Sequence, residues 1–204
     1  MFIGEWNKSV ILTYIGVGFA VLGICLAGSG SLLQAYACLM TAGVCDLFDG
    51  AVARKCKRTE AQKRFGIELD SLADVVSFLA LPVAICIGMG MRQWYHMAVL
   101  LLFSICGIAR LAFFNAADAD GEEPVKYYRG LPVTYTALIL PLAYLLKYVL
   151  PDNDIFLAVF TGVMALVALL NILDIKVVKP KGIAYVFFAV LAIVMLVLFL
   201  AVLT

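Results

Sequence analysis

Charged residues are scarce in this sequence of 204 residues: they make up 14% of it, and the formal net charge is only +1. A chain so close to neutral lacks the basic surface that binds nucleic acid, so nucleic acid is not expected as a partner. Hydrophobic residues make up 65% instead, whereas a soluble domain is about half apolar. The sequence therefore predicts an integral membrane protein, of a length that suits one domain over residues 1–204.

Paired cysteines and a cleavable leader are also missing. None of the six cysteines forms a CxxC pair, and all but Cys56 lie in apolar runs. This excludes a disulfide framework or a zinc site and favours small apolar fillers of membrane helices. The first ten residues have no basic stretch and no small-residue cleavage site, so no removable signal peptide is expected. The only histidine, His96, follows Trp94 and Tyr95 in a pattern typical of a membrane interface, so it is not a catalytic candidate.

Long apolar runs are what the chain has in abundance. A membrane-spanning helix needs roughly 20 mostly apolar residues, and several runs meet this requirement. The expected fold class is therefore all-α, a polytopic membrane helix bundle of about seven transmembrane helices. The predicted spans are about 9–28, 31–53, 67–90, 94–115, 132–150, 154–174 and 183–203.

The loops between these spans differ in basic content, which predicts the orientation of the chain. Cytosolic loops of membrane proteins carry an excess of Lys and Arg. Of the 15 Lys and Arg residues, only Arg92 and Lys147 fall on the side opposite the N-terminus, and Arg110 lies inside a span. The N-terminal side is therefore expected to face the cytosol. The basic residues on that side are Lys8, Arg54, Lys55, Lys57, Arg58, Lys63, Arg64, Lys126, Arg129, Lys176, Lys179 and Lys181.

The second predicted span ends in a stripe of acidic and small residues. Spacings of i, i+3, i+4, i+7 and i+8 place five residues on one helical face: Asp46, Asp49, Gly50, Ala53 and Arg54. The small residues leave room for a flat base or a pyrophosphate to approach the backbone, although they are also typical of close helix packing. The Arg54 guanidinium can offer paired hydrogen-bond donors to a phosphate.

The third predicted span opens with a matching stripe. Gly66, Asp70 and Asp74 are spaced i, i+4 and i+8 and share one helical face. A loop of about eleven residues joins the two helices, so they are antiparallel neighbours with both stripes at the same end. The four carboxylates are therefore expected to face one another near the cytosolic surface of the membrane.

Four facing carboxylates need an explanation, because each costs up to about 2.5–3.5 kcal/mol at the centre of a span and like charges repel. Bound divalent cations offset both penalties, and carboxylate oxygens suit Mg²⁺ or Mn²⁺. The sequence therefore predicts a site for two Mg²⁺ or Mn²⁺ ions, held by Asp46, Asp49, Asp70 and Asp74.

The two stripes together resemble the signature of the CDP-alcohol phosphotransferase family. Eight positions with fixed spacings carry the resemblance: Asp46-x-x-Asp49-Gly50-x-x-Ala53-Arg54, eleven residues, then Gly66-x-x-x-Asp70-x-x-x-Asp74. The resemblance implies that the aspartates ligate metal and that Asp74 is also the catalytic general base. It further implies that the residues around the CDP-linked lipid are Asp49, Gly50, Ala53, Arg54, Gly66 and Asp70.

The family resemblance also implies an organisation for the chain. The six-helix core of the family corresponds to residues about 9–174, and the last predicted span, about 183–203, is an addition to it. A homodimer is compatible with the family and with the small-residue stripes. One departure lies in the first span, which reads ILTYIG and lacks the Pro-Asn pair that often precedes this position in the family.

Three later segments resemble the bacterial and archaeal phosphatidylserine synthase branch of the family. They are Arg110–Asn115, Tyr128–Val133 and Ile175–Lys181. This resemblance implies L-serine as the acceptor alcohol, and the serine carboxylate needs a cation in a partly dry pocket. Arg110 or Arg129 is expected to bind this carboxylate, with Asn115 as a further hydrogen-bond partner.

Each of these three residues also has a simpler interpretation. Arg110 could form a salt bridge with one of the aspartates, Arg129 could anchor the chain at the membrane interface, and Asn115 could cap a helix. The ammonium group of serine would use an acidic residue such as Glu68 or a lipid phosphate, and the sequence does not choose between them.

The predicted reaction is transfer of the phosphatidyl group from CDP-diacylglycerol to the hydroxyl of L-serine, by an enzyme of the cell membrane whose site faces the cytosol. Two alternatives keep this chemistry: another acceptor, such as glycerol 3-phosphate or inositol phosphate, and an archaeal ether-lipid donor. A different class of protein, a divalent-cation transporter, would use the aspartates as an ion path, although no matching acids lie across the bilayer midplane.

Overall fold

The computed structural model describes residues 4–119, 127–150 and 152–178, together with positions 190, 193, 194, 197 and 199. Side chains are described throughout these ranges except at 117–119, 127–129 and 176–178. The predicted seventh span, 183–203, therefore lies outside the described residues apart from five positions.

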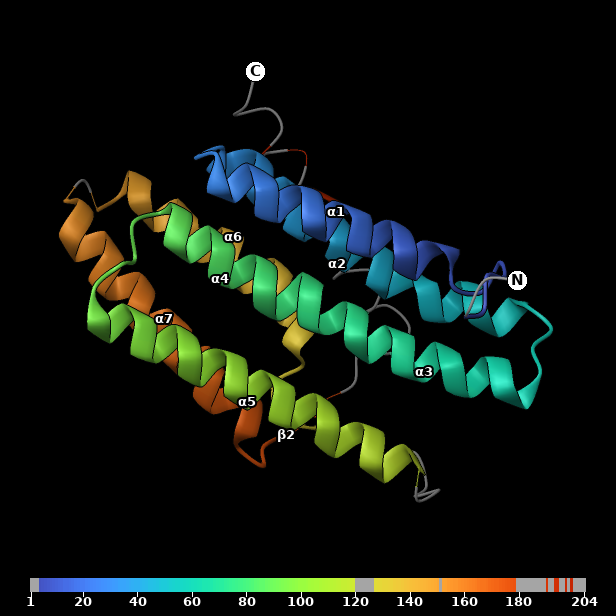
Figure 1. Cartoon of the computed structure of the whole chain (residues 1–204). Coiled ribbons are helices and arrows are strands. Elements are labelled where there is room, and N and C mark those ends of the chain that lie inside the picture. Colours follow the sequence, from blue (N-terminus) through green and yellow to red (C-terminus); the bar gives the residue numbers. More distant parts are fainter. Residues whose placement is uncertain are drawn as a thin grey trace.

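Five helices in the described part are long and apolar enough to cross a membrane, and they lie roughly side by side (Figure 1). The expectation of an all-α polytopic membrane bundle is thereby confirmed. Except for the start of the third helix, their bounds lie within a few residues of the predicted spans. They are α1 (Ile11–Gly28), α2 (Leu32–Lys55), the continuous helix Glu60–Gly88, α5 (Trp94–Ala119) and α7 (Asn153–Ile172).

The third helix begins earlier than predicted, at Glu60 instead of residue 67. Thr59 and Gln62 form a capping box, in which the Thr59 hydroxyl accepts from the Gln62 backbone N–H (3.3 Å) and Gln62 Oε1 accepts from the Thr59 N–H (3.1 Å). The first turns are polar, so hydropathy alone misses them, and they place Gly66 inside a helix. The parts of this helix are α3 (Glu60–Asp74), the π-helical turn η1 (Val75–Ala80) and α4 (Leu81–Gly88).

The π-helical turn η1 follows Asp74 directly and has an identifiable cause. Pro82 has no N–H to donate to the carbonyl of Phe78, four residues earlier, so the regular ladder is interrupted there. The Thr136 hydroxyl shares its hydrogen between the carbonyl oxygens of Phe78 (3.4 Å) and Val133 (2.8 Å). A side chain of the sixth span therefore supplies the hydrogen bond that Pro82 cannot.

The sixth apolar segment in the described part is shorter than the other five. It lies within the predicted span 132–150 and is helical over Val133–Tyr148, with 3₁₀ turns at both ends. Because a 3₁₀ turn rises about 2.0 Å per residue against 1.5 Å in an α-helix, the segment reaches further than its residue number suggests. Its parts are η2 (Val133–Tyr135), α6 (Thr136–Tyr144) and η3 (Leu145–Tyr148).

Two short strands pair in antiparallel orientation. The first, β1 (Tyr127–Arg129), precedes the sixth segment, and the second, β2 (Lys176–Val178), follows α7. The sequence analysis did not predict these strands. They place the backbone of Arg129 opposite that of Lys176. Two segments that carry basic residues and are distant in sequence are thereby joined.

Two further backbone hydrogen bonds join the residues that follow β1 to the end of α7 and the residues just after it. The Gly130 N–H donates to the carbonyl of Ile175 (2.9 Å), and the Leu131 N–H donates to the carbonyl of Leu170 (2.8 Å). Gly130 has a φ of +74°, and a Cβ there would lie 2.7 Å from the carbonyl oxygen of Asn171. Glycine is therefore required both by the backbone conformation and by this close approach.

Small residues allow α1 and α2 to lie close together. A Cβ added at Gly16 would lie 3.3 Å from the Cβ of Cys45, and one at Gly23 would lie 2.9 Å from the Cβ of Cys38. Such contacts between small residues are how membrane helices bring their backbones together. All six cysteines are free, and four of them are buried.

Candidate active site

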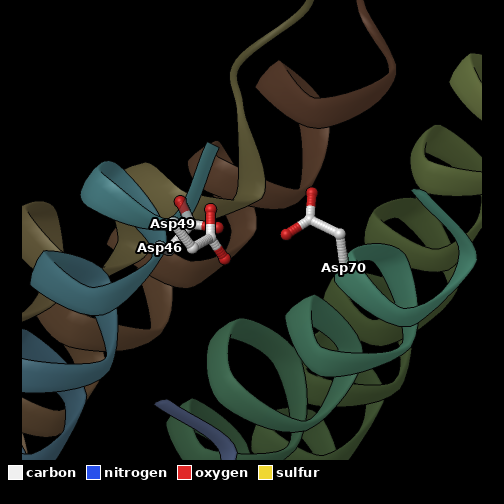
Figure 2. Close-up of side chains that lie close together, drawn as sticks. All are labelled: Asp46, Asp49 and Asp70. Atoms are coloured by element: carbon white, nitrogen blue, oxygen red, sulfur yellow. The ribbon is translucent and has the colours of Figure 1, made fainter. Parts of the chain in front are cut away.

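Three aspartates meet between α2 and α3. Asp46 and Asp49 project from α2 toward Asp70 of α3 (Figure 2), and one oxygen from each carboxylate lies within 4.8 Å of the other two. Oxygen ligands lie about 2.0–2.1 Å from Mg²⁺ and 2.3–2.6 Å from Ca²⁺, so oxygens on opposite sides of such an ion are about 4–5 Å apart. The three side chains therefore fit a hard divalent cation, as the two facing stripes predicted.

The fourth aspartate, Asp74, faces the same space from the last turn of α3. It lines a small pocket together with Asp46, Asp49 and Asp70. Its side chain interacts directly with that of Asp46, although it does not belong to the group of three close carboxylate oxygens. The predicted meeting of the four carboxylates is therefore observed, with Asp74 one helical turn deeper along α3 than Asp70.

Thr13 of α1 joins this acidic cluster, although the sequence analysis did not single it out. Its hydroxyl donates to Oδ2 of Asp49 at 2.9 Å, while Asp49 is only 8% exposed. The hydrogen bond fixes the orientation of a buried carboxylate. Thr13 lies in the ILTYIG stretch of the first predicted span, where a lone threonine in an apolar run gives no signal of such a contact.

A cavity of about 200 Å³ opens beside the aspartates, between α1, α2 and α3. It is lined by all six residues predicted to bind the CDP-linked lipid, which are Asp49, Gly50, Ala53, Arg54, Gly66 and Asp70. Asp49 and Asp70 belong both to the acidic cluster and to this cavity. A group bound in the cavity would therefore lie directly against the cluster. Five further lining residues were not predicted: Ser9, Val10, Thr13, Arg58 and Ile67.

Two arginines of this cavity lie over glycines. A Cβ added at Gly50 would lie 3.4 Å from Nη1 of Arg54, and one at Gly66 would lie 3.7 Å from Nη1 of Arg58. Because glycine has no side chain, the space beside each guanidinium group stays open. Two guanidinium groups in one cavity favour an anion with several oxygens, such as a pyrophosphate.

Arg110 of α5 does not line this cavity, but its charge acts on the acidic cluster. Its charge attracts Asp74, and its Cζ lies 4.7 Å from the centroid of the Phe114 ring. The salt bridge between Arg110 and an aspartate, the simpler interpretation of this residue, stays a prediction. Arg110 also lines a second cavity, of about 250 Å³, together with Ala109, Phe113, Asn171, Ile172, Leu173 and Asp174.

The other two predicted serine-binding residues are placed differently. Asn115 accepts a hydrogen bond from the Ser71 hydroxyl (2.8 Å) and donates to Glu68 Oε2 (3.4 Å). Its amide therefore links α5 to α3, and it does not line the cavity that contains Arg110. The backbone of Arg129 lies in β1, whereas its side chain lies outside the described residues.

Comparison with known proteins gives one family for most of the chain. Residues 6–173 match the family described as CDP-alcohol phosphatidyltransferase. This range contains both aspartate stripes and every residue that lines the two cavities except Asp174. It ends one residue after α7.

Curated relatives carry related names. The chain is 37% identical over 142 residues to a CDP-diacylglycerol–serine O-phosphatidyltransferase of Saccharomyces cerevisiae, which covers 66% of this chain and 50% of that protein. A Helicobacter pylori protein of the same name is 31% identical over 81% of this chain and 69% of its own length. An archaetidylserine synthase of Methanothermobacter thermautotrophicus is 31% identical over 76% of this chain and 64% of its own length. The chain spans about half the length of the first curated relatives it matches.

Proposed function

Because this chain belongs to the CDP-alcohol phosphatidyltransferase family, we propose that it transfers the phosphatidyl group of CDP-diacylglycerol to the hydroxyl of L-serine, giving phosphatidylserine and CMP. The observation that carries the proposal is the shared wall of the acidic cluster and the cavity lined by two arginines. The names of the relatives support serine as the acceptor.

The donor is proposed to bind with its cytidine diphosphate in the cavity between α1, α2 and α3, while its acyl chains stay in the lipid. Arg54 and Arg58 would bind phosphate oxygens through charge-assisted hydrogen bonds. Gly50 and Gly66 let the nucleotide approach the helix backbones, because a side chain at either position would fill the space beside the guanidinium groups.

The four aspartates are proposed to hold two divalent ions, Mg²⁺ or Mn²⁺. Asp46, Asp49 and Asp70 supply the close carboxylate oxygens, and Asp74 adds the fourth carboxylate. Bound metal supplies Lewis-acid polarisation of the pyrophosphate and neutralises the charge that develops on the leaving CMP.

Asp74 is proposed as the general base. Its carboxylate would accept the proton of the serine hydroxyl, and the serine oxygen would form a bond to the lipid-side phosphorus while the bond from that phosphorus to the CMP oxygen breaks. Asp74 suits this role because it faces the acidic cluster from one turn deeper in α3 and is attracted by the charge of Arg110.

The orientation and assembly of the chain are part of the same proposal. The basic residues at the end of α2, such as Arg54 and Lys55, lie at the same end as the aspartates, and basic loops favour the cytosol. We therefore place the site at the cytosolic face of the cell membrane, where CDP-linked lipid and free serine can both reach it. A homodimer remains part of the proposal on the family resemblance alone.

An ether-lipid donor is the second candidate, because one relative is named an archaetidylserine synthase and matches 76% of this chain. The reacting groups would be the same, since the two donors differ only in how the chains join the glycerol. Parallel assays with ester and ether forms of the CDP-linked lipid would separate the two donors.

The proposed reaction is tested by CMP release from the purified protein with CDP-diacylglycerol and Mg²⁺ or Mn²⁺. Release is expected with serine and not with glycerol 3-phosphate, inositol phosphate or inositol. Release with one of the other acceptors would keep the chemistry and overturn serine. If folded protein releases no CMP with any acceptor but carries Mn²⁺ into vesicles, the transporter alternative replaces the enzyme.

Arg58 offers a sharp test of the donor cavity, because its neighbour Lys57 provides a matched control. Arg58→Gln is expected to raise the KM for CDP-diacylglycerol roughly 10- to 100-fold, the range for the loss of one charge-assisted hydrogen bond of about 1.5–3 kcal/mol. Lys57→Gln removes the same charge next to the cavity but not from its lining, so its KM should stay near that of the wild type. An equal rise of this KM in the two variants would show that Arg58 contributes only its charge and does not contact the donor directly.

A further inference from the structure

We propose that the cavity between α5 and the end of α7 binds the zwitterionic part of the acceptor, with the carboxylate on Arg110, the ammonium group near Asp174 and the Asn171 amide completing the site. This inference rests on the proposed function, since it names how the acceptor of that reaction is held. The cavity measures about 250 Å³, many times the roughly 10–15 Å³ that one water needs by the same measure, so it has room for a small amino acid.

Asn171 is the first observation that points to a ligand. It is only 2% exposed, yet both its Oδ1 and its Nδ2 are buried without a hydrogen-bond partner among the described residues. Buried amides are almost always hydrogen-bonded, and the exceptions call for a bound molecule or water. Because Asn171 lines the cavity, a molecule there can both donate to Oδ1 and accept from Nδ2. A zwitterion offers both kinds of group.

The charges of the lining are the second observation. Arg110 comes from α5 and Asp174 follows α7, and both line the same cavity. Opposite charges in the lining of one cavity match an α-amino acid, whose carboxylate and ammonium groups are carried by the same carbon. A guanidinium binds a carboxylate through two parallel hydrogen bonds. A phosphorylated acceptor such as glycerol 3-phosphate would instead face the negative charge of Asp174.

One residue, Arg110, relates this cavity to the reaction centre. Arg110 attracts Asp74, the proposed base, while lining this cavity on α5. An acceptor held by Arg110 is thus brought toward the acidic cluster. The wall formed by residues 171–174 is held in place by the backbone hydrogen bonds from Gly130 to Ile175 and from Leu131 to Leu170.

The role of Asp174 is tested by charge removal with a matched control. Asp174→Asn is expected to raise the KM for serine roughly 10- to 100-fold, the range for one charge-assisted contact, with little change in the KM for CDP-diacylglycerol. Inhibition by 3-hydroxypropionate, which has the carboxylate and hydroxyl but no ammonium group, should not weaken. Asp154→Asn, an exposed position at the other end of α7, should leave both KM values unchanged. Equal loss of serine and 3-hydroxypropionate binding would overturn the assignment of Asp174.

The role of Asn171 is tested by an apolar residue of similar size. Asn171→Leu removes two buried polar atoms that have no partner in the described part of the chain, so the melting temperature should stay the same or rise. The KM for serine should rise roughly 10-fold or more. A lower melting temperature together with an unchanged serine KM would show that Asn171 serves the fold instead.

Binding of radiolabelled serine to the purified protein, without lipid donor, separates this inference from the proposed function. Serine binding that is weakened by Asp174→Asn, in a protein that releases no CMP, would keep the cavity and overturn the reaction. Turnover of serine with an unchanged KM in Asp174→Asn and Asn171→Leu would keep the reaction and overturn the cavity. Absence of both serine binding and serine turnover would overturn both.

Discussion

Replacement of Asp74 by asparagine is expected to abolish turnover while the protein remains folded. The amide has nearly the same shape as the carboxylate but cannot accept a proton from the attacking hydroxyl. A positioned general base contributes roughly 10²- to 10⁴-fold to the rate, so CMP release should fall by at least that factor. Because Asp74 shares its space with three other aspartates, removing one of four like charges should not lower the melting temperature measured without divalent metal.

The measurement is the initial rate of CMP release at saturating serine and CDP-diacylglycerol, together with the melting temperature of the detergent-purified protein. Asp154→Asn again serves as the control, because it makes the same chemical change at an exposed residue at the other end of α7. Near-normal turnover in Asp74→Asn would remove Asp74 as the base and leave it as a metal ligand at most.

The general architecture could be predicted because two physical rules act locally. A bilayer requires about 20 apolar residues per helix, which located the spans from α1 to α7. The helical period of 3.6 residues then placed Asp46 and Asp49 on one face of α2, and Asp70 and Asp74 on one face of α3. A short loop made these helices neighbours, so the meeting of their carboxylates followed without any knowledge of the remaining helices.

Features that depend on contacts between distant segments could not be predicted in this way. The capping box that starts α3 at Glu60 lies in a polar stretch where hydropathy is silent. The hydrogen bond from Thr13 to Asp49 depends on how α1 lies against α2, and a lone threonine in an apolar run carries no signal. The strands β1 and β2 form because two loops meet in space.

The acceptor side shows the same limit. Arg110 and Asn115 lie five positions apart on one helix, and the sequence analysis assigned both to serine. In the structure Asn115 forms hydrogen bonds with Ser71 and Glu68 of α3. Arg110 instead lines a cavity together with residues at the end of α7 and just after it. Asn171 was overlooked because a single asparagine near the end of an apolar run looks like an ordinary helix terminus. Its significance appears only when its burial and its missing partners are known.

Removal of divalent metal is expected to have the second largest effect, because the proposed metal centre would contribute to both stability and chemistry. Exhaustive chelation should reduce CMP release to background, and added Mg²⁺ or Mn²⁺ should restore it. Metal bound only by the folded protein stabilises it by about 2.7 kcal/mol when present at 100 times its Kd. For a chain of this size that corresponds to a rise in melting temperature of roughly 5–10 °C.

The melting temperature provides a readout of metal binding that does not depend on activity. In Asp70→Asn the group of three close carboxylate oxygens loses one member, so the metal-induced rise should shrink or disappear, whereas Asp154→Asn should keep it in full. Without metal, Asp70→Asn should be at least as stable as the wild type, because the repulsion between Asp70 and its two neighbours on α2 is relieved. Activity that survives chelation, or a full metal-induced rise in Asp70→Asn, would contradict the assignment of the aspartates as a metal centre.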